Sequence, residues 1–290
     1  MAENYCLYLC SQGIRKSCNL FSLINHDNVN EYDFSKLNNG DTLYIKTDAI
    51  YDFYKNLNKI DKNFILVTGS SDYTLPYDKF SHEEFINFIE NDKILKWYVE
   101  NCIISHRKII KIPIGLDYHT MSYNNHKWGT KKSPKEQERE LIYIKSLGKQ
   151  YYDRELKIYS NCHFFTTTRY GNDRIDAINN IDKNLLYLEP IPVDRNTTWL
   201  KQINFSFVLS PHGNGLDCHR TWEALVLGCI PIVKSSDIDE LYEDLPVLIV
   251  NDWKDITENL LKNTLDNFKN KQFNYNKLTL NYWTNQWTNK

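Results

Sequence analysis

The chain has 290 residues, of which 41% are hydrophobic and 14% aromatic, with 35 Lys and Arg against 37 Asp and Glu. This length suits two domains of ordinary size, and the composition is that of a globular protein. The formal net charge of −2 creates no strong field toward nucleic acid or an anionic membrane surface, so neither is expected as a partner.

The cysteines favour a reducing compartment. Seven are present, an odd number, and no two form a Cys-x-x-Cys pair. Several lie in apolar runs, where a free Cys behaves as a small hydrophobic residue and not as part of a disulfide framework. The N-terminus lacks the features of a signal peptide, and no stretch is apolar over the length of a membrane span. We expect a soluble, cytoplasmic protein.

Strand-like and helical runs alternate in the first part of the chain, which favours α/β layers with parallel sheets. The expected strands are 5–10, 41–47, 63–69 and 107–115. The expected helices, with apolar residues at helical spacing, are 49–60 and 82–101. The polar stretch 118–140 has little apolar periodicity, and we place a domain boundary near residue 130.

The same alternation then starts again and predicts a second doubly wound domain. The expected strands are 157–168, 184–190, 205–210, 230–235 and 247–252. The expected helices are 173–181, 194–204, 217–228, 237–245 and 253–268. The predicted division is therefore a domain over 1–130, a domain over 131–274, and a terminal helix over 275–290 that can pack back on the first domain.

A loop with two of the ten glycines follows the buried strand 205–210. Gly213 and Gly215 allow a positive φ and a close approach of the backbone to a ligand. Asp217 has the right side chain to cap the next helix, whose N-terminal N–H groups attract phosphate. Doubly wound domains bind ligands at this edge of the sheet, so we expect a nucleotide's phosphates here. The spacing is not Gly-x-Gly-x-x-Gly, so no dinucleotide site is predicted.

Three polar side chains share one face of this helix: His219, Arg220 and Glu223. Glu223 lies in a segment that should be buried, and a buried carboxylate needs a partner. One interpretation is a structural salt bridge from Glu223 to Arg220. In the other, Glu223 accepts hydrogen bonds from the ribose hydroxyls while Arg220 faces a phosphate.

The segment 210–233, SPHGNGLDCHRTWEALVLGCIPIV, resembles the donor-site segment of exostosin-type glycosyltransferases. The shared features are Pro211 and Gly213, Arg220 and Glu223, and the Gly-Cys-Ile-Pro run 228–231. The segments 163–174 and 251–253 are similar to further parts of the family's donor domain. Short exostosin-like enzymes of large algal viruses have the most similar character, which would place the protein in a host cytoplasm.

Two features depart from that family. His212 stands where the family often has Arg, and the membrane anchor of most cellular relatives is not found in this sequence. The first departure puts a phosphate contact at position 212 in doubt.

The resemblance implies the GT-B fold: two Rossmann-like, doubly wound α/β domains that face each other across a cleft. The first domain would bind the acceptor, an oligosaccharide or a glycoprotein glycan, and the second the nucleotide-sugar. The implied reaction is inverting transfer of a monosaccharide from a UDP-sugar to a hydroxyl, with no obligatory metal or other cofactor. Xylose, galactose and glucuronic acid all stay open, and the viral likeness favours xylose.

The predicted donor site gathers the polar residues and glycines of the second domain's two loops. Its residues are Ser210, His212, Gly213, Asn214, Gly215, Asp217, His219, Arg220, Thr221, Glu223, Arg169 and Arg174. Arg169 and Arg220 would balance the charge of the diphosphate leaving group. The alternative for Arg169 is an ordinary surface arginine, and for Arg174 a cap of its own helix.

Asp72 is the predicted catalytic base, because it opens a loop after the strand 63–69. An inverting transfer needs one base to take the proton of the attacking hydroxyl. His82 and His106 are lesser candidates, and a turn-forming role for Asp72 is the alternative. Asp117 and His119 line either the acceptor side or an ordinary boundary loop.

No metal site is predicted. The group His212, Asp217 and His219 matches no zinc spacing. The run 237–239 is an Asp-x-Asp motif, which other glycosyltransferases use to hold a metal–diphosphate, but two acidic residues are ordinary at a helix start.

Two other functions stay open. One is a catalytically inactive module that binds a nucleotide-sugar or glycan. The other is a different Rossmann-type enzyme, a transferase or an oxidoreductase, although the missing Gly-x-Gly-x-x-Gly motif counts against the latter.

Overall fold

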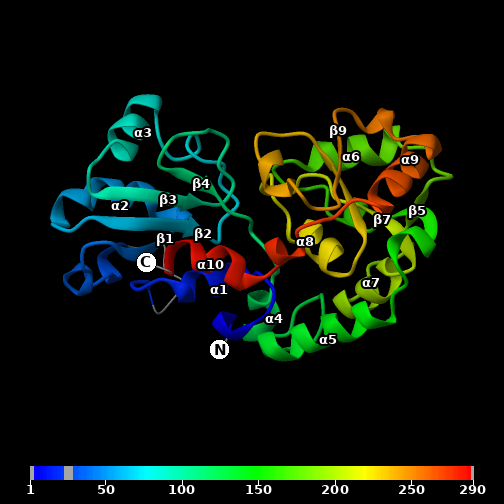
Figure 1. Ribbon diagram of the computed structural model, residues 1–290, viewed down its shortest axis with the longest axis horizontal. Helices are drawn as coiled ribbons and strands as arrows, with labels where there is room; N and C mark the ends of the chain where they lie inside the picture. The colour runs from blue at the N-terminus through cyan, green and yellow to red at the C-terminus, as the bar shows by residue number, and fades with distance from the viewer. Residues whose placement is uncertain (1–2, 23–28, 289–290) are drawn as a thin grey trace.

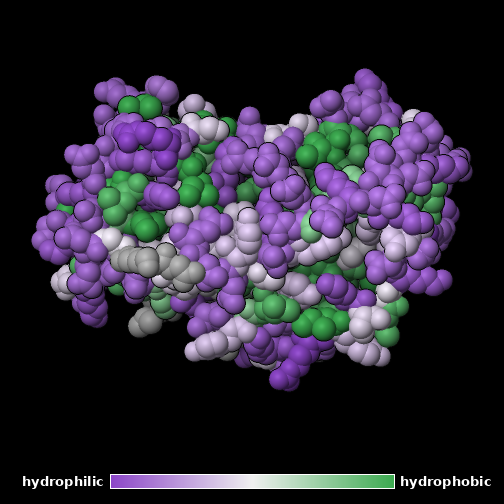
Figure 2. Space-filling view, viewed as in Figure 1, coloured by the Kyte–Doolittle hydropathy of each residue, from purple (hydrophilic) through white to green (hydrophobic). Residues whose placement is uncertain are grey.

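Two parallel β-sheets, each with helices around it, form the protein (Figure 1). The structure is a computed structural model that describes residues 3–22 and 29–288. The predicted fold class, α/β with two Rossmann-like domains built on parallel sheets, is confirmed. Figure 2 shows the surface hollowed between the two lobes.

The first sheet has the strand order β1-β2-β3-β4. Its strands are β1 (Asp41–Lys46), β2 (Phe64–Gly69), β3 (Ile94–Val99) and β4 (Ile109–Lys111). The helices of this half are α1 (Ser11–Ser17), α2 (Ile50–Asn56), α3 (His82–Ile89) and α4 (His119–Tyr123).

The second sheet has the order β6-β5-β7-β8-β9, so the direction of winding reverses between β5 and β7. Its strands are β5 (Glu155–Ser160), β6 (Leu186–Leu188), β7 (Phe205–Leu209), β8 (Ile230–Lys234) and β9 (Leu248–Val250). The helices are α5 (Pro134–Leu147), α6 (Gly171–Asn180), α7 (Arg195–Gln202), α8 (His219–Val226) and α9 (Glu258–Lys269). Such a reversal opens a crevice at the carboxyl ends of the strands.

Three expected elements are corrected. The run 5–10 forms only isolated bridges, at Tyr8 and Cys10, and no strand. The helix expected over 82–101 ends at Ile89, and the run after it is β3, which pairs with β2 on one side and β4 on the other. A short apolar run fits helix and strand alike, and the pairing partner decides between them. The helix expected over 237–245 is one 3-10 turn, Asp239–Tyr242.

The polar stretch 118–140 contains α4 and the start of α5. Ser133 and Glu136 form a capping box at the start of α5, where each side chain accepts a hydrogen bond from the other's backbone N–H, and Pro134 occupies the first turn. This Ser-Pro-x-Glu pattern is a local helix-start signal that apolar periodicity alone overlooks.

The last helix, α10 (Leu280–Thr288), packs against α1 at the opposite end of the chain (Figure 1). The Trp287 indole N–H donates to Ser17 Oγ at 3.2 Å, and its ring lies 4.8 Å from that of Tyr98 in β3. One apolar cluster continues from this contact to the helix α8 of the second domain. The domain limits at 130 and 274 stay predictions.

All seven cysteines are free, and all except Cys218 are buried. Within the described residues, no helix is both long enough and apolar enough to cross a lipid bilayer.

Trp287→Ala tests the contribution of α10. The indole is 2% exposed, so its removal leaves a cavity beneath the first sheet, and we expect the free energy of unfolding to fall by about 3–5 kcal/mol. Urea denaturation measures the change. Tyr143→Ala, at a side chain 64% exposed, is the control and should stay within about 0.5 kcal/mol of the parent. Equal stability of the two variants would contradict the prediction.

Candidate functional site

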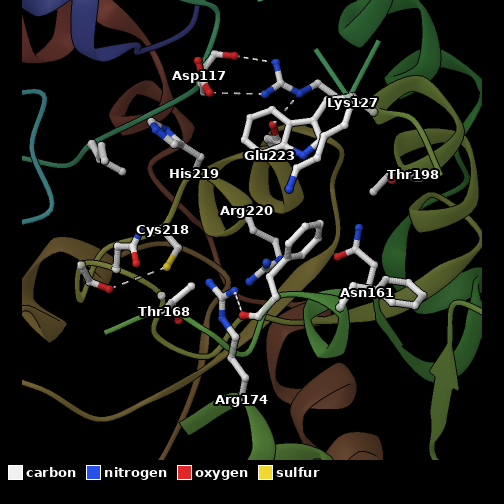
Figure 3. A pocket seen from close by; sticks show the side chains of 18 of the residues that line it. Asp117, Lys127, Asn161, Thr168, Arg174, Thr198, Cys218, His219, Arg220 and Glu223 are labelled. Atoms are coloured by element: carbon white, nitrogen blue, oxygen red, sulfur yellow. Dashed lines mark hydrogen bonds and ion pairs between the residues drawn. The ribbon is translucent and has the colours of Figure 1, made fainter. Parts of the chain in front are cut away.

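A pocket of about 410 Å³ lies between the two domains. Asp72 comes from the first domain. The stretch between the domains, which joins the end of β4 to the start of β5 (residues 112–154), contributes Ile114, Asp117, Lys127 and Trp128. The second domain supplies the rest of the wall from the loops after β5, β6 and β7, from α6 and α7, and from the start of α8 (Figure 3). The pocket therefore occupies the crevice that the reversal between β5 and β7 creates.

The glycine loop does not use the left-handed backbone conformation that the sequence suggested, because neither Gly213 nor Gly215 has a positive φ. Both glycines make room for other side chains. A Cβ on Gly213 would lie 2.5 Å from Arg174 Nη2, and one on Gly215 would lie 3.0 Å from Asn101 Nδ2. The glycines thus let an arginine from α6 and an asparagine from the first domain approach the loop backbone.

Asp217 does not cap α8, which corrects the sequence prediction; Cys218 occupies that position and caps with no side-chain hydrogen bond. The Asp217 carboxylate instead accepts from the Ile114 N–H at 2.8 Å and the Trp222 indole N–H at 2.8 Å. Burial raises the pKa of Asp217, although these hydrogen bonds act against it. Asp217 thereby fastens the loop to the stretch between the domains.

Two arginines in the pocket wall have no carboxylate partner among the described residues. Arg174 is 7% exposed and donates only to carbonyl oxygens, of Phe165 at 2.5 Å and of His212 at 3.1 Å. The Nη1 of Arg220 is buried without any hydrogen-bond partner. Burial, and then the charge of Arg220, lower the pKa of Arg174. Their guanidinium groups lie close together in Figure 3 and repel each other, so an anion between them would be stabilising.

Glu223 pairs with Arg195 and not with Arg220, which corrects the predicted salt bridge. Glu223 Oε1 lies 3.6 Å from Arg195 Nε. Arg195 also donates to the Asp117 carbonyl at 2.6 Å and lies 3.6 Å from the Asp117 carboxylate. Its guanidinium stands 4.9 Å from the Trp128 ring. One buried arginine from α7 thus orients two carboxylates of the pocket.

Asp117, His119 and His219 form a polar group at the pocket, whose wall includes Asp117 and His219. His119 Nδ1 lies 3.0 Å from Asp117 Oδ1, without hydrogen-bond alignment, and the His219 Nδ1 lies 2.6 Å from the Gly115 carbonyl oxygen. Burial acts to raise the pKa of Asp117, but the charges of His219, His119 and Arg195 outweigh it and hold that pKa well below its ordinary value. Burial also lowers the pKa of His119.

Three of the predicted donor-site residues lie behind the loop and not in the pocket wall. Ser210 and Thr221 share a hydrogen bond of 2.8 Å, and both are buried. His212 Nδ1 stands 3.3 Å from Asp173 Oδ2, and its backbone N–H donates to the same carboxylate. Gly213, Asn214, Gly215, Asp217, His219, Arg220, Glu223 and Arg174 do line the pocket.

Arg169 lies outside this pocket, at a second one of about 430 Å³ next to it. Its guanidinium forms an ion pair with Asp78 of the first domain, one hydrogen bond of which measures 2.8 Å. Beside it, Thr74 and Tyr170 share a hydrogen bond of 3.1 Å between the domains. Asp72 and Asn214 line both pockets, so the two cavities meet at these residues.

The lesser candidates lie elsewhere. His106 pairs with Glu90 at 3.0 Å, and His82 begins α3. Asp239 accepts from the Ser236 N–H at 3.0 Å, as an acidic residue does at the start of a helical turn. In residues 3–22 and 29–288, no three His, Cys, Asp or Glu side chains are grouped as metal ligands would be.

Sequence reasoning missed several wall residues, among them Lys127, Trp128, Asn161 and Arg195. Arg195 had one usable signal, its position at the start of α7 after an N-capping Asp194 on the same side of the sheet as the glycine loop. Lys127 lies in the polar stretch between the domains, and its Nζ stands 4.3 Å from the Phe165 ring. Nothing local in the sequence distinguishes it from a surface lysine.

Comparisons with known proteins add little. No family model matches the chain, and neither does any curated protein. The N-terminal domain of trehalose-6-phosphate phosphatase from Candida albicans is 11% identical, with a TM-score of 0.41, over 89% of this chain and 69% of that one. A mutant of TarM from S. aureus, in complex with fondaparinux, alpha-GlcNAc-glycerol and UDP, is 12% identical with a TM-score of 0.31, over 84% of this chain and 51% of its own. Neither likeness says what this chain binds or does.

Asp117→Asn tests the group around Arg195. Because the folded-state pKa of Asp117 lies below its ordinary value of 3.8, the stability from its charge is fully present above that value and is lost as the pH falls through the folded-state pKa. We expect the substitution to lower the free energy of unfolding at neutral pH by about 3 kcal/mol.

The free energies of unfolding of Asp117→Asn and of the parent should steadily become more similar as the pH falls below about 4. Urea titrations over a range of pH values measure both, with the exposed Asp266→Asn on α9 as the control. A difference that does not change down to about pH 2.5 would contradict the assignment.

Proposed function

We propose that this chain is a glycosyltransferase that moves a monosaccharide from a UDP-sugar to a hydroxyl of a glycan acceptor. The observation that carries the proposal is the pair Arg174 and Arg220, two guanidinium groups in one pocket that no carboxylate of residues 3–22 and 29–288 pairs with. They stand where the glycine loop meets the N-terminus of α8, a place suited to a diphosphate. The resemblance of segment 210–233 to exostosin-type glycosyltransferases supports the same function.

The proposed donor lies with its diphosphate between Arg174 and Arg220 and its ribose hydroxyls toward Glu223. Arg195 would orient the Glu223 carboxylate for those hydroxyls. The sugar then points toward Asp72, where the two pockets meet. The second pocket would hold the acceptor, an oligosaccharide or a glycoprotein glycan.

In the proposed reaction the acceptor oxygen attacks the anomeric carbon from the face opposite the diphosphate. The bond between that carbon and the diphosphate oxygen breaks, UDP leaves with the electron pair, and Asp72 takes the hydroxyl proton. The configuration of the sugar is therefore inverted. Arg174, Arg220 and the N-terminus of α8 balance the developing charge, so the proposal includes no obligatory metal.

Two finer parts of the proposal rest on the resemblance alone. Xylose is the proposed sugar, with galactose and glucuronic acid as the other candidates. Arg169, predicted to act on the leaving group, is engaged by Asp78, so that role requires the ion pair to open when the donor binds.

Arg220→Ala tests the diphosphate site. Loss of one cation that balances leaving-group charge should lower turnover about a hundredfold, and it should weaken UDP binding as measured by calorimetry. The control is Arg139→Ala, an exposed arginine of α5. The proposal fails if the parent binds neither UDP nor any UDP-sugar, or if the two variants bind UDP equally well. Binding without transfer to a broad panel of acceptors would favour an inactive binding module.

Asp72→Asn tests the base. The amide cannot accept the proton, so transfer should nearly stop while donor binding, measured by calorimetry, stays unchanged. The exposed Asp266→Asn serves again as the matched control, with parental activity expected. Transfer by Asp72→Asn at the parental rate would show that another group takes the proton.

A further inference from the structure

A side-chain amide faces the pocket at the end of β5 without a partner. Asn161 directly follows β5 and is half-buried. Figure 3 shows its amide turned toward the cavity. No described residue forms a hydrogen bond with this side chain. A half-buried amide has donors and an acceptor available, so it is suited to a ligand that offers both.

The position of Asn161 relative to the glycine loop follows from the sheet. β5 pairs with β7, with Tyr159 beside Val208, so the residues after the two strands stand on either side of the crevice. In Figure 3, Asn161 and Thr198 lie on one side of Arg220, while Cys218 and His219 lie on the other. The amide is therefore at the end of the pocket away from the second pocket, whose wall does not include it.

The turn that follows Asn161 carries Phe164, and Phe165 comes directly after it, so two aromatic residues follow this amide closely in the chain. Phe164, Phe165, Trp128 and Val193 line the same cavity, and the Lys127 ammonium covers the Phe165 ring at 4.3 Å. Aromatic faces of this kind stack on nucleobases, whereas a diphosphate needs cations and free N–H groups. The pocket thus has a cationic centre at Arg174 and Arg220 and an aromatic end with one free amide.

We propose that this aromatic end is the nucleobase subsite and that Asn161 reads the edge of the base. This inference rests on the proposed function. For the uracil of a UDP-sugar, the Asn161 amide N–H donates to the O4 carbonyl and the amide oxygen accepts from the N3–H. The base then lies at the end opposite Asp72, which leaves the sugar at the junction of the two pockets.

Asn161→Asp provides the test, because it removes the donor and keeps the acceptor. The carboxylate repels the uracil O4, whereas inorganic pyrophosphate carries no base and is not expected to reach position 161. We expect calorimetry to show UDP binding weakened at least tenfold, with pyrophosphate binding unchanged, so that the ratio of the UDP and pyrophosphate affinities falls at least tenfold.

The matched control is Asn259→Asp, an exposed asparagine of α9, which should keep the parental ratio. Retained pyrophosphate binding by Asn161→Asp shows that the variant is folded. If UDP binds the parent and Arg220→Ala weakens it, but Asn161→Asp leaves the ratio unchanged, the base subsite is wrong while the proposed function stands. Parental binding of GDP as tight as that of UDP would overturn the assignment to uracil. If no nucleotide binds the parent, both proposals fail.

Discussion

The buried carboxylate of Asp217 is the constraint on which the rest of the site depends. It accepts hydrogen bonds from the Ile114 N–H and the Trp222 indole, and its own backbone N–H donates to Asn101 of the first domain at 2.9 Å. A buried charge is tolerated only when its hydrogen bonds are made. The glycine loop is therefore held against the first domain through Asn101, against the stretch between the domains through Ile114, and against α8 through Trp222.

That shape brings cations together. Gly213 admits Arg174 beside Arg220, and neither guanidinium meets a carboxylate in the part of the chain that the structure describes, whereas Arg195 one helix away meets two, Asp117 and Glu223. The three arginines therefore differ: Arg195 is paired within the wall, and the charge of the other two is not balanced there.

The chemical character of the pocket also changes from one end to the other. Its cationic centre lies between an aromatic end at Asn161 and a polar end at Asp72, where the second pocket begins. A nucleotide-sugar has the same order of chemistry: a flat base, a diphosphate and a sugar. The ion pair of Arg169 and Asp78 links the two domains next to the second pocket, whose wall includes Arg169.

The sequence by itself determined the features whose cause is local. The alternation of apolar runs was enough to predict two parallel α/β domains, and the strand, glycine loop and helix over 205–228 pointed to the carboxyl edge of β7, where a pocket lies. Arg220 and Glu223 were recognisable as neighbours because residues three apart share a helix face.

Only the tertiary structure decided which distant groups meet. The partner of Glu223 is Arg195 of another helix, and Asp217 binds the backbone of Ile114 instead of capping α8. Lys127 and Asn161 reach the pocket because the stretch between the domains and the end of β5 fold beside the glycine loop. Periodicity and capping act within one segment, whereas such pairs depend on how the two sheets pack together, and no local pattern encodes that distance.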